Sequence, residues 1–199
     1  MKILAIAGSP RRGGNTDTLL DQAISGARSK GAEVERVSLS RLNVAPCIEC
    51  NRCLESGRCA VEDDYQALYD KTLEADGIML AAPIFFTNLN AHTKAFVDRF
   101  QSLWALRYVL EKPVPLPPGG ERRRAIFLSA AGSLKTKFDC SLSVVRAFLA
   151  TIDAELVGKL CVNGIDDKGE VSEHPETLEQ AYALGSLLAT GEQADDAVK

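Results

Sequence analysis

Short apolar runs alternate along this chain with longer stretches whose apolar residues recur every three or four positions. The short runs are predicted to be strands, and they occupy residues 2–7, 33–39, 77–82, 125–129 and part of 156–162. Parallel strands that neighbour one another need crossover connections, and helices supply these on both faces of a sheet. The alternation therefore predicts an α/β fold with a doubly wound five-stranded parallel sheet in a three-layer α/β/α sandwich.

Helical periodicity fills the stretches between and after these strands. The expected helices carry apolar residues at 19–27, 65–73, 91–103, 138–152 and 178–188. No internal repeat interrupts this order, so residues 1–190 are predicted to form one domain, followed by a polar tail at 191–199. Residues 111–121 are rich in proline and glycine and cannot form a helix or a central strand. This segment is expected to be a surface loop and is a candidate flap near the active site.

Charge and hydropathy narrow the classes of function. A net charge of −4 over 199 residues gives no electrostatic footprint for nucleic acid. The three arginines at 122–124 fit a solvated entry into a strand better than a polyanion site. No stretch is long and apolar enough to cross a membrane or to act as a signal peptide. The chain is therefore expected to be cytoplasmic, where thiols stay reduced and clustered cysteines favour a cofactor over disulfides.

Four cysteines lie close together in the loop at 47–59. Cys47, Cys50, Cys53 and Cys59 follow the spacing C-x2-C-x2-C-x5-C. This spacing lets one loop turn successive thiols inward, as a [4Fe–4S] cluster requires, whereas four-cysteine zinc sites usually draw two pairs from separate segments. A reduced loop without metal, a zinc site and transient disulfides stay open as alternatives. Cys140 and Cys161 are expected to be core residues.

The loop after the first predicted strand is rich in glycine and hydroxyl side chains and leads directly into a helix. Backbone N–H groups and the positive end of the helix dipole favour a phosphate there, and Ser9, Arg11, Asn15 and Thr16 add polar or charged side chains. The segment has neither the Gly-Lys-Ser/Thr ending of a P-loop nor the G-x-G-x-x-G spacing of a dinucleotide site, so a phosphate monoester fits best. The alternative is a plain turn in which Asn15 caps the helix.

Two further loops are expected at the same edge of the sheet, because both follow parallel strands. The first has two adjacent aromatic side chains, which suit a flat ring but would equally suit the core. Its residues are Pro83, Ile84, Phe85, Phe86, Thr87 and Asn88. The second has only small side chains and lets a ring approach the backbone. Its residues are Ser129, Ala130, Ala131 and Gly132. A phosphate loop, an aromatic loop and a small-residue loop together predict FMN.

Motifs over nearly the whole chain carry a family resemblance. They lie at 3–11, 14–16, 47–59, 63–64, 75–77, 83–86 and 94–99. In these segments the chain resembles the NADPH-dependent FMN reductase group of flavodoxin-like proteins, and most closely its iron–sulfur flavoprotein branch. Asp98 and Arg99 match a helix motif of that group and are expected to form an exposed or sheet-edge ion pair.

The resemblance implies a flavodoxin-like fold and two redox cofactors. FMN would be held at its phosphate by Ser9, Arg11, Asn15 and Thr16, and at its ring by residues 83–88 and 129–132. A [4Fe–4S] cluster would be held by the four cysteines at 47–59. It also implies a homodimer or homotetramer in which the cluster of one subunit lies near the flavin of another.

The leading hypothesis is an FMN-dependent electron-transfer oxidoreductase in which FMN is coupled to the cluster. The electron donor would be NAD(P)H or a ferredoxin-like protein. One alternative is an NAD(P)H-dependent FMN or quinone reductase without a cluster, and another is a flavin-binding redox sensor whose cysteines act as a switch. No catalytic side chain is expected, because the chemistry is centred on the flavin and neither His92 nor His174 has a partner that suggests hydrolysis.

Overall fold

A parallel sheet of five strands forms the centre of the molecule in the computed structural model, which describes residues 1–191. The strands stand in the order β2-β1-β3-β6-β7, and every neighbouring pair is parallel. Their bounds are Lys2–Ala7 for β1, Glu33–Ser38 for β2, Gly77–Ala81 for β3, Arg123–Ala131 for β6 and Ala154–Asn163 for β7. The five predicted strands and the doubly wound α/β fold are confirmed, although β6 and β7 extend beyond their predicted ends.

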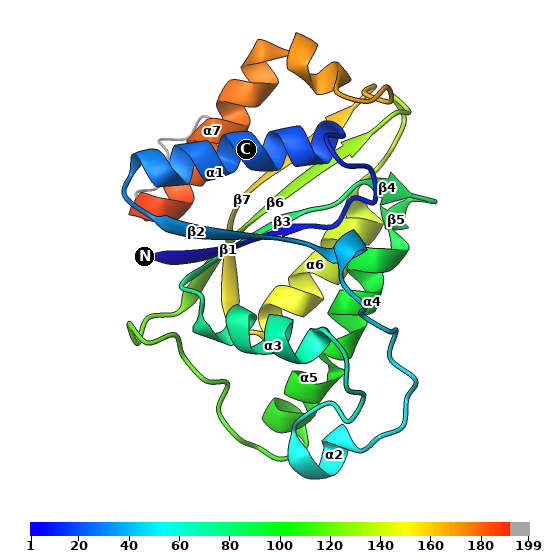
Figure 1. The fold of residues 1–199 in the computed structure, drawn as a ribbon, viewed down its shortest axis with the longest axis vertical. Coiled ribbons are helices and arrows are strands. Elements are labelled where there is room, and N and C mark those ends of the chain that lie inside the picture. Colours follow the sequence, from blue (N-terminus) through cyan, green and yellow to red (C-terminus); the bar gives the residue numbers. More distant parts are fainter. Residues whose placement is uncertain (192–199) are drawn as a thin grey trace.

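Helices cover both faces of this sheet (Figure 1). One face carries α1 (Asn15–Ser29) and α7 (Pro175–Thr190). The other face carries α3 (Tyr65–Glu74), α4 (Ala91–Arg99), α5 (Gln101–Tyr108) and α6 (Asp139–Thr151). Within the described residues no helix is long and apolar enough to cross a membrane. The predicted tail at 191–199 lies, from residue 192, outside the described residues.

The side chains on the two faces of each central strand belong to two separate hydrophobic cores. In β1, Ile3 and Ala5 pack toward α1 and α7, whereas Leu4 and Ile6 pack toward the helices of the opposite layer. Successive side chains of a strand point to opposite faces, so a strand covered on both faces is apolar at every position. This burial explains why the central strands contain continuous apolar runs, such as residues 3–7 in β1 and 78–81 in β3.

Several short elements interrupt the predicted pattern. The helix expected at 91–103 is two helices, α4 and α5, because the N–H of Phe100 bonds to the carbonyl of Val97 in a tighter turn. The Phe100 ring still packs edge-on against Phe96 and Phe148, so the apolar periodicity continues through the break. The hairpin of β4 (Ile84–Phe85) and β5 (Asn88–Leu89), the short helix α2 (Cys53–Ser56), and the 3₁₀ turns Leu39–Arg41 and Glu170–Glu173 were not predicted.

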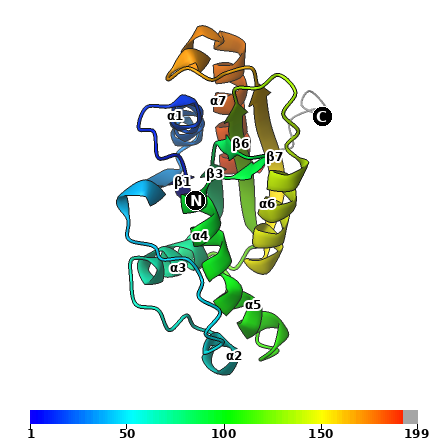
Figure 2. The same cartoon turned by 90° about the vertical axis from the view of Figure 1, so that its right-hand side faces the viewer.

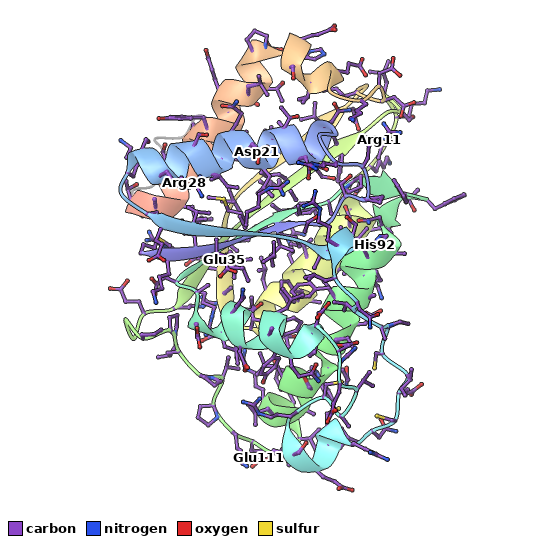
Figure 3. All side chains as sticks on the ribbon, viewed as in Figure 1. Arg11, Asp21, Arg28, Glu35, His92 and Glu111 are labelled. Carbon is purple, nitrogen blue, oxygen red and sulfur yellow. The ribbon has the colours of Figure 1, made fainter. Side chains whose placement is uncertain are left out.

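The proline-rich segment at 111–121 forms a surface loop, as predicted, but it is not a flap at the carboxyl edge of the sheet. It leads into the amino end of β6, and Figure 3 places Glu111 at the opposite end of the molecule from Arg11 of the phosphate loop. The carbonyl of Pro115 accepts a hydrogen bond from Arg123, which ties the segment down at the amino edge. The segment therefore lies at the amino edge of the sheet, away from the loops that follow the carboxyl ends of the strands.

One of the three arginines at 122–124 is buried, which corrects the prediction of a solvated strand entry. Arg123 is 0% exposed, and its guanidinium donates to the carbonyls of Thr72, Leu73, Pro115 and Ile152. Thr72 and Leu73 lie in the last turn of α3, and Ile152 directly follows α6. A cation that bonds the free carbonyls at two helix C-termini stabilises both ends. Arg122, in contrast, is exposed and pairs with Asp153.

Replacing Arg123 with leucine is expected to lower the free energy of unfolding by about 3–5 kcal/mol, because two buried and two partly buried carbonyls lose their donor. Arg122→Leu, which removes the same charge from an exposed side chain, is expected to cost less than about 1 kcal/mol. Chemical denaturation of the two variants measures the difference. Equal losses of stability in both variants would show that the buried contacts of Arg123 contribute nothing.

Candidate functional site

Loops from four strands surround a cavity of about 270 Å³, here termed the sheet-edge cavity. The loops follow the carboxyl ends of β1, β3, β6 and β7. The lining residues are Ser9, Pro10, Arg11, Gly14, Asn15, Thr16, Pro83, Ile84, Phe85, Ala130, Ala131, Gly132, Ile165 and Asp166. Doubly wound sheets bind ligands at this edge, at the switch point between β1 and β3.

Glycine begins the loop after β1 because there is no room for a side chain. A Cβ atom at Gly8 would lie 2.0 Å from the hydroxyl oxygen of Thr93. The Gly8 N–H donates to the carbonyl of Ala81 (2.7 Å), and the Gly8 carbonyl accepts from the amide of Asn90 (2.7 Å). These contacts fix the start of the loop against the end of β3 and the beginning of α4.

Hydrogen bonds within the loop hold its turn in place. The N–H of Arg11 donates to the hydroxyl of Ser9 (3.1 Å), and the N–H of Gly13 donates to the carboxylate of Asp17 (2.9 Å). Asp17 is itself held by an ion pair with Arg36 at 3.0 Å. The guanidinium of Arg11 reaches across the cavity mouth and donates to the carbonyl of Asp166 (3.1 Å). The loop is thus preformed at the N-terminus of α1.

Asn15 and Thr16 use their side chains differently. The amide of Asn15 donates to the carbonyl of Asp167 (2.9 Å) and accepts from the N–H of Val171 (3.2 Å), so it ties the loop after β7 to α1. The Thr16 hydroxyl has no hydrogen-bond partner among residues 1–191, although the residue is only 3% exposed and lines the cavity. Thr16 therefore offers a donor to a ligand, whereas Asn15 can offer only its backbone N–H.

The two predicted ring loops reach the cavity only in part. Pro83, Ile84 and Phe85 line it, but the chain then turns in the β4–β5 hairpin. Phe86 and Thr87 occupy the two-residue turn with φ of 48° and 66°, the left-handed pair that a type I′ turn requires. Phe86 is consequently fully exposed to solvent and neither caps the core nor lines the cavity.

Three other predicted positions also lie off the cavity wall. Thr87 and Asn88 stay in the hairpin, where the side chain of Asn88 accepts the N–H of Leu89 (2.8 Å). Ser129 is buried, and its hydroxyl donates to the carbonyl of Ala82 at 2.7 Å. Ala130, Ala131 and Gly132 do line the cavity.

Sequence reasoning missed the contribution of the loop after β7. Ile165 and Asp166 complete the cavity wall, and a Cβ at Gly132 would lie 2.7 Å from the Asp166 side chain. The rule that ligands bind beyond the carboxyl ends of parallel strands would have indicated this loop. Its polar side chains follow an edge strand and match no recognisable motif, so the sequence alone does not single them out.

A second cavity, of about 380 Å³, is lined by all four cysteines of the predicted cluster motif. Here termed the cysteine cavity, it lies between the loop at 47–59 and the junction of α4 and α5. Both views place α2, which begins at Cys53, at the far end of the molecule beyond α5 (Figures 1 and 2). Within residues 1–191 no group of three or more His, Cys, Asp or Glu side chains is close enough to hold a metal ion. The cysteines thus share a cavity without being gathered as ligands.

The backbone around Cys50 has an unusual conformation. Glu49 and Asn51, on either side of it, both have positive φ angles, 53° and 60°. Such angles are uncommon outside glycine and redirect the chain at each residue. Burial raises the pKa of the Cys53 thiol, and the neighbouring Cys59, Cys47 and Cys50 raise it further. The Cys53 thiol is therefore near enough to each of the other three thiols to interact with it electrostatically.

The remaining cysteines differ from each other. Cys161 is partly buried against the core, as expected, and burial raises the pKa of its thiol to about 11. Cys140 is exposed, which corrects the prediction that it is a core residue. It is the second residue of α6, whose buried face carries Leu142, Val145 and Leu149 instead.

Arg99 forms a buried ion pair, which corrects the prediction of an exposed or sheet-edge pair. Its guanidinium bonds both carboxylate oxygens of Asp63 (2.7 and 3.2 Å), and both side chains are almost fully buried. Burial alone would raise the pKa of Asp63, but hydrogen bonds from Arg99, Ala45 and Tyr65 outweigh it and hold the pKa below its usual range. Asp98 points elsewhere and pairs with Lys94 on the partly exposed face of α4.

Comparison with known families gives a match over most of the chain. The family model described as NADPH-dependent FMN reductase matches residues 1–163. That range contains three of the four loops of the sheet-edge cavity and the whole cysteine cavity.

Individual proteins give further matches. The iron-sulfur flavoprotein MJ1083 of Methanocaldococcus jannaschii is 41% identical over 103 residues, which are 52% of this chain and 53% of that protein. An iron-sulfur flavoprotein of Methanosarcina thermophila is 38% identical over 124 residues, 61% of this chain and 65% of that protein. The matched regions thus cover about half to two thirds of these relatives. A solved flavone reductase shares the fold with a TM-score of 0.71 at 23% identity, over 95% of this chain and 62% of that chain.

Proposed function

Because the chain belongs to the NADPH-dependent FMN reductase family, we propose that it is an FMN-dependent oxidoreductase that also holds a [4Fe–4S] cluster on Cys47, Cys50, Cys53 and Cys59. One observation carries the second half of the proposal, namely that all four cysteines line the same cavity. The donor set is the one that such clusters use, four thiolates from a short loop. The names of the iron-sulfur flavoproteins among the relatives support the same assignment.

The sheet-edge cavity has the features that FMN requires. Its phosphate would lie against the N-terminus of α1, where the helix dipole favours an anion and the unpartnered hydroxyl of Thr16 adds a donor. Ser9 shapes the turn, the charge of Arg11 lies at the cavity mouth, and Asn15 fixes the loop after β7 and contributes its backbone N–H. These residues bind and orient the cofactor.

The ring would occupy the remainder of the same cavity. Pro83, Ile84 and Phe85 supply one apolar wall, and Ala130, Ala131 and Gly132 supply a second wall without bulky side chains. When bound, FMN supplies hydride and single-electron chemistry, and a [4Fe–4S] cluster supplies single-electron transfer. The residues that line the cavity bind and orient FMN, and the redox chemistry is that of the cofactor.

Assembly into a homodimer or homotetramer is a further part of the proposal. The two cavities lie toward opposite ends of α4, which has nine residues and is about 13 Å long. Phe85 and Phe86 are exposed beside the sheet-edge cavity, where a second copy would cover them. A second subunit would therefore both bury apolar surface and bring its own cysteine cavity toward the flavin.

The experiment that tests the oxidoreductase activity is anaerobic mixing of the FMN-loaded protein with NADPH and, separately, with reduced ferredoxin. Bleaching of the visible flavin absorbance by at least one of these donors is expected. A bound flavin that dithionite reduces but that neither donor bleaches would contradict the proposed activity. Bleaching by NADPH in protein that contains no iron would instead support a cluster-free FMN or quinone reductase.

A further inference from the structure

Arg99, the last residue of α4, lines the cysteine cavity and uses every one of its N–H groups in a hydrogen bond. A guanidinium has five N–H donors. Two of them bind the carboxylate of Asp63, and two more bind the carbonyls of Ala45 (2.9 Å) and Val61 (2.8 Å). The fifth, on Nε, lies 3.1 Å from the Sγ atom of Cys59. The last contact is the only one of the five that is made to a group with redox chemistry.

The contacts of Arg99 enclose the cysteine run in the sequence as well as in space. Ala45 lies just before Cys47, and Val61 lies just after Cys59. The guanidinium therefore joins the two ends of the segment that carries all four thiols. Its flat face covers the ring of Tyr65, with 4.5 Å from the central carbon to the ring centroid. The Arg99 guanidinium is hydrogen-bonded along its edges and stacked on one face, so it cannot move without breaking several of these hydrogen bonds.

An ion pair that served only to join α4 to the loop would not need the contact to sulfur. Asp63 already balances the charge of Arg99 and accepts two of its bonds. A thiol is a weak hydrogen-bond acceptor, whereas a thiolate bound to iron carries negative charge and accepts more strongly. The hydrogen bond from the Arg99 Nε–H to Cys59 is therefore strongest when the Cys59 sulfur is an iron-bound thiolate.

We propose that Arg99 is a positioning residue for the cluster, holding the Cys59 sulfur in place and raising the reduction potential of the cluster through the Nε–H···Sγ hydrogen bond. This inference rests on the proposed function. Reduction adds one electron to the cluster and its thiolates, so a cationic donor stabilises the reduced state more than the oxidised state. The low exposure of the guanidinium strengthens the effect, because water does not screen it there.

The test is an anaerobic redox titration of the iron-containing protein, followed by electron paramagnetic resonance of the reduced cluster. In Arg99→Lys the charge is retained but the planar fork and its bond to sulfur are lost. At the wild-type midpoint potential, the ratio of reduced to oxidised cluster is expected to fall about tenfold, which corresponds to 59 mV for one electron. In Arg99→Gln, which also loses the charge, this ratio is expected to fall further.

Arg107→Gln is the matched control, because it removes one positive charge from α5, and Arg107 does not line the cysteine cavity. The midpoint potential of its cluster is expected to equal that of the wild type. Wild-type midpoint potentials in both Arg99 variants would overturn the inference. A folded, FMN-containing Arg99→Lys protein that fails to retain iron would support it, since Cys59 would then have lost its support.

A measurement on the unaltered protein covers the case in which the Arg99 variants do not fold. With ¹⁵N-arginine as the only labelled residue, pulsed electron paramagnetic resonance of the reduced cluster is expected to show a hyperfine coupling to arginine nitrogen. Its absence from a cluster-containing sample would overturn the inference and leave the proposed function intact. A wild-type protein that holds no iron after anaerobic reconstitution would overturn the cluster half of the proposed function and, with it, the inference.

Discussion

Thr16→Glu is expected to weaken FMN binding at least about a hundredfold. The substitution places a carboxylate in the sheet-edge cavity at the start of α1, where the phosphate is proposed to bind. Two unit charges about 4 Å apart repel by about 4 kcal/mol near a protein surface, and each 1.4 kcal/mol is a factor of ten in affinity. Titration of FMN fluorescence against the metal-free protein measures the change.

Thr18→Glu is the control for this prediction. It adds the same charge to the same turn of α1, but Thr18 does not line the sheet-edge cavity, and its hydroxyl bonds the carbonyl of Gly14. Its FMN affinity is expected to stay within about a few-fold of the wild type, because the remaining effect is that of a screened charge. Similar affinities in both variants would place the phosphate elsewhere.

Cys50→Ser is expected to lose nearly all iron and to keep FMN. Serine oxygen is a harder ligand than thiolate and suits an iron–sulfur cluster poorly. Cys50 lies between two residues with positive φ, so no other side chain of the run can take its place without rebuilding that backbone. Because FMN is proposed to bind at the opposite end of α4, its content per chain should not change.

Cys140→Ser supplies the matched control, since it removes an exposed thiol from α6 that lies outside the cysteine cavity. Iron content is measured in both variants after anaerobic reconstitution. Equal iron in Cys50→Ser and the wild type would exclude Cys50 as a ligand. Loss of iron and FMN together would show instead that the substitution disrupts the fold.

The fold was predictable because its signals are local. Each central strand contains a continuous apolar run and ends at a glycine, a proline or a small residue, and the helices show their buried face as a period of three to four. The sheet-edge cavity followed from the same pattern, since loops after parallel strands must meet at one edge. Ser9, Arg11 and Thr16 could therefore be placed together from the sequence.

The features that the sequence did not show depend on contacts between distant segments. Arg99 and Arg123 look like ordinary surface cations, and only the packing of α4 and β6 buries them against carbonyls and Asp63. In the sequence Phe86 looks like a ring-binding residue. In the structure it lies in the two-residue turn of a hairpin, and its side chain points into the solvent. The tertiary structure determines which charged side chains are buried and in which direction a turn points. The apolar periodicity of the sequence does not contain this information.

The amounts of iron, acid-labile sulfide and FMN per chain, measured after anaerobic purification and reconstitution, test the central claim most directly. Four cysteines that line one cavity beside a flavodoxin-like sheet predict about four irons, about four sulfides and one FMN per chain. One FMN per chain with no iron and no sulfide would contradict the claim that the cysteine cavity holds a second redox centre.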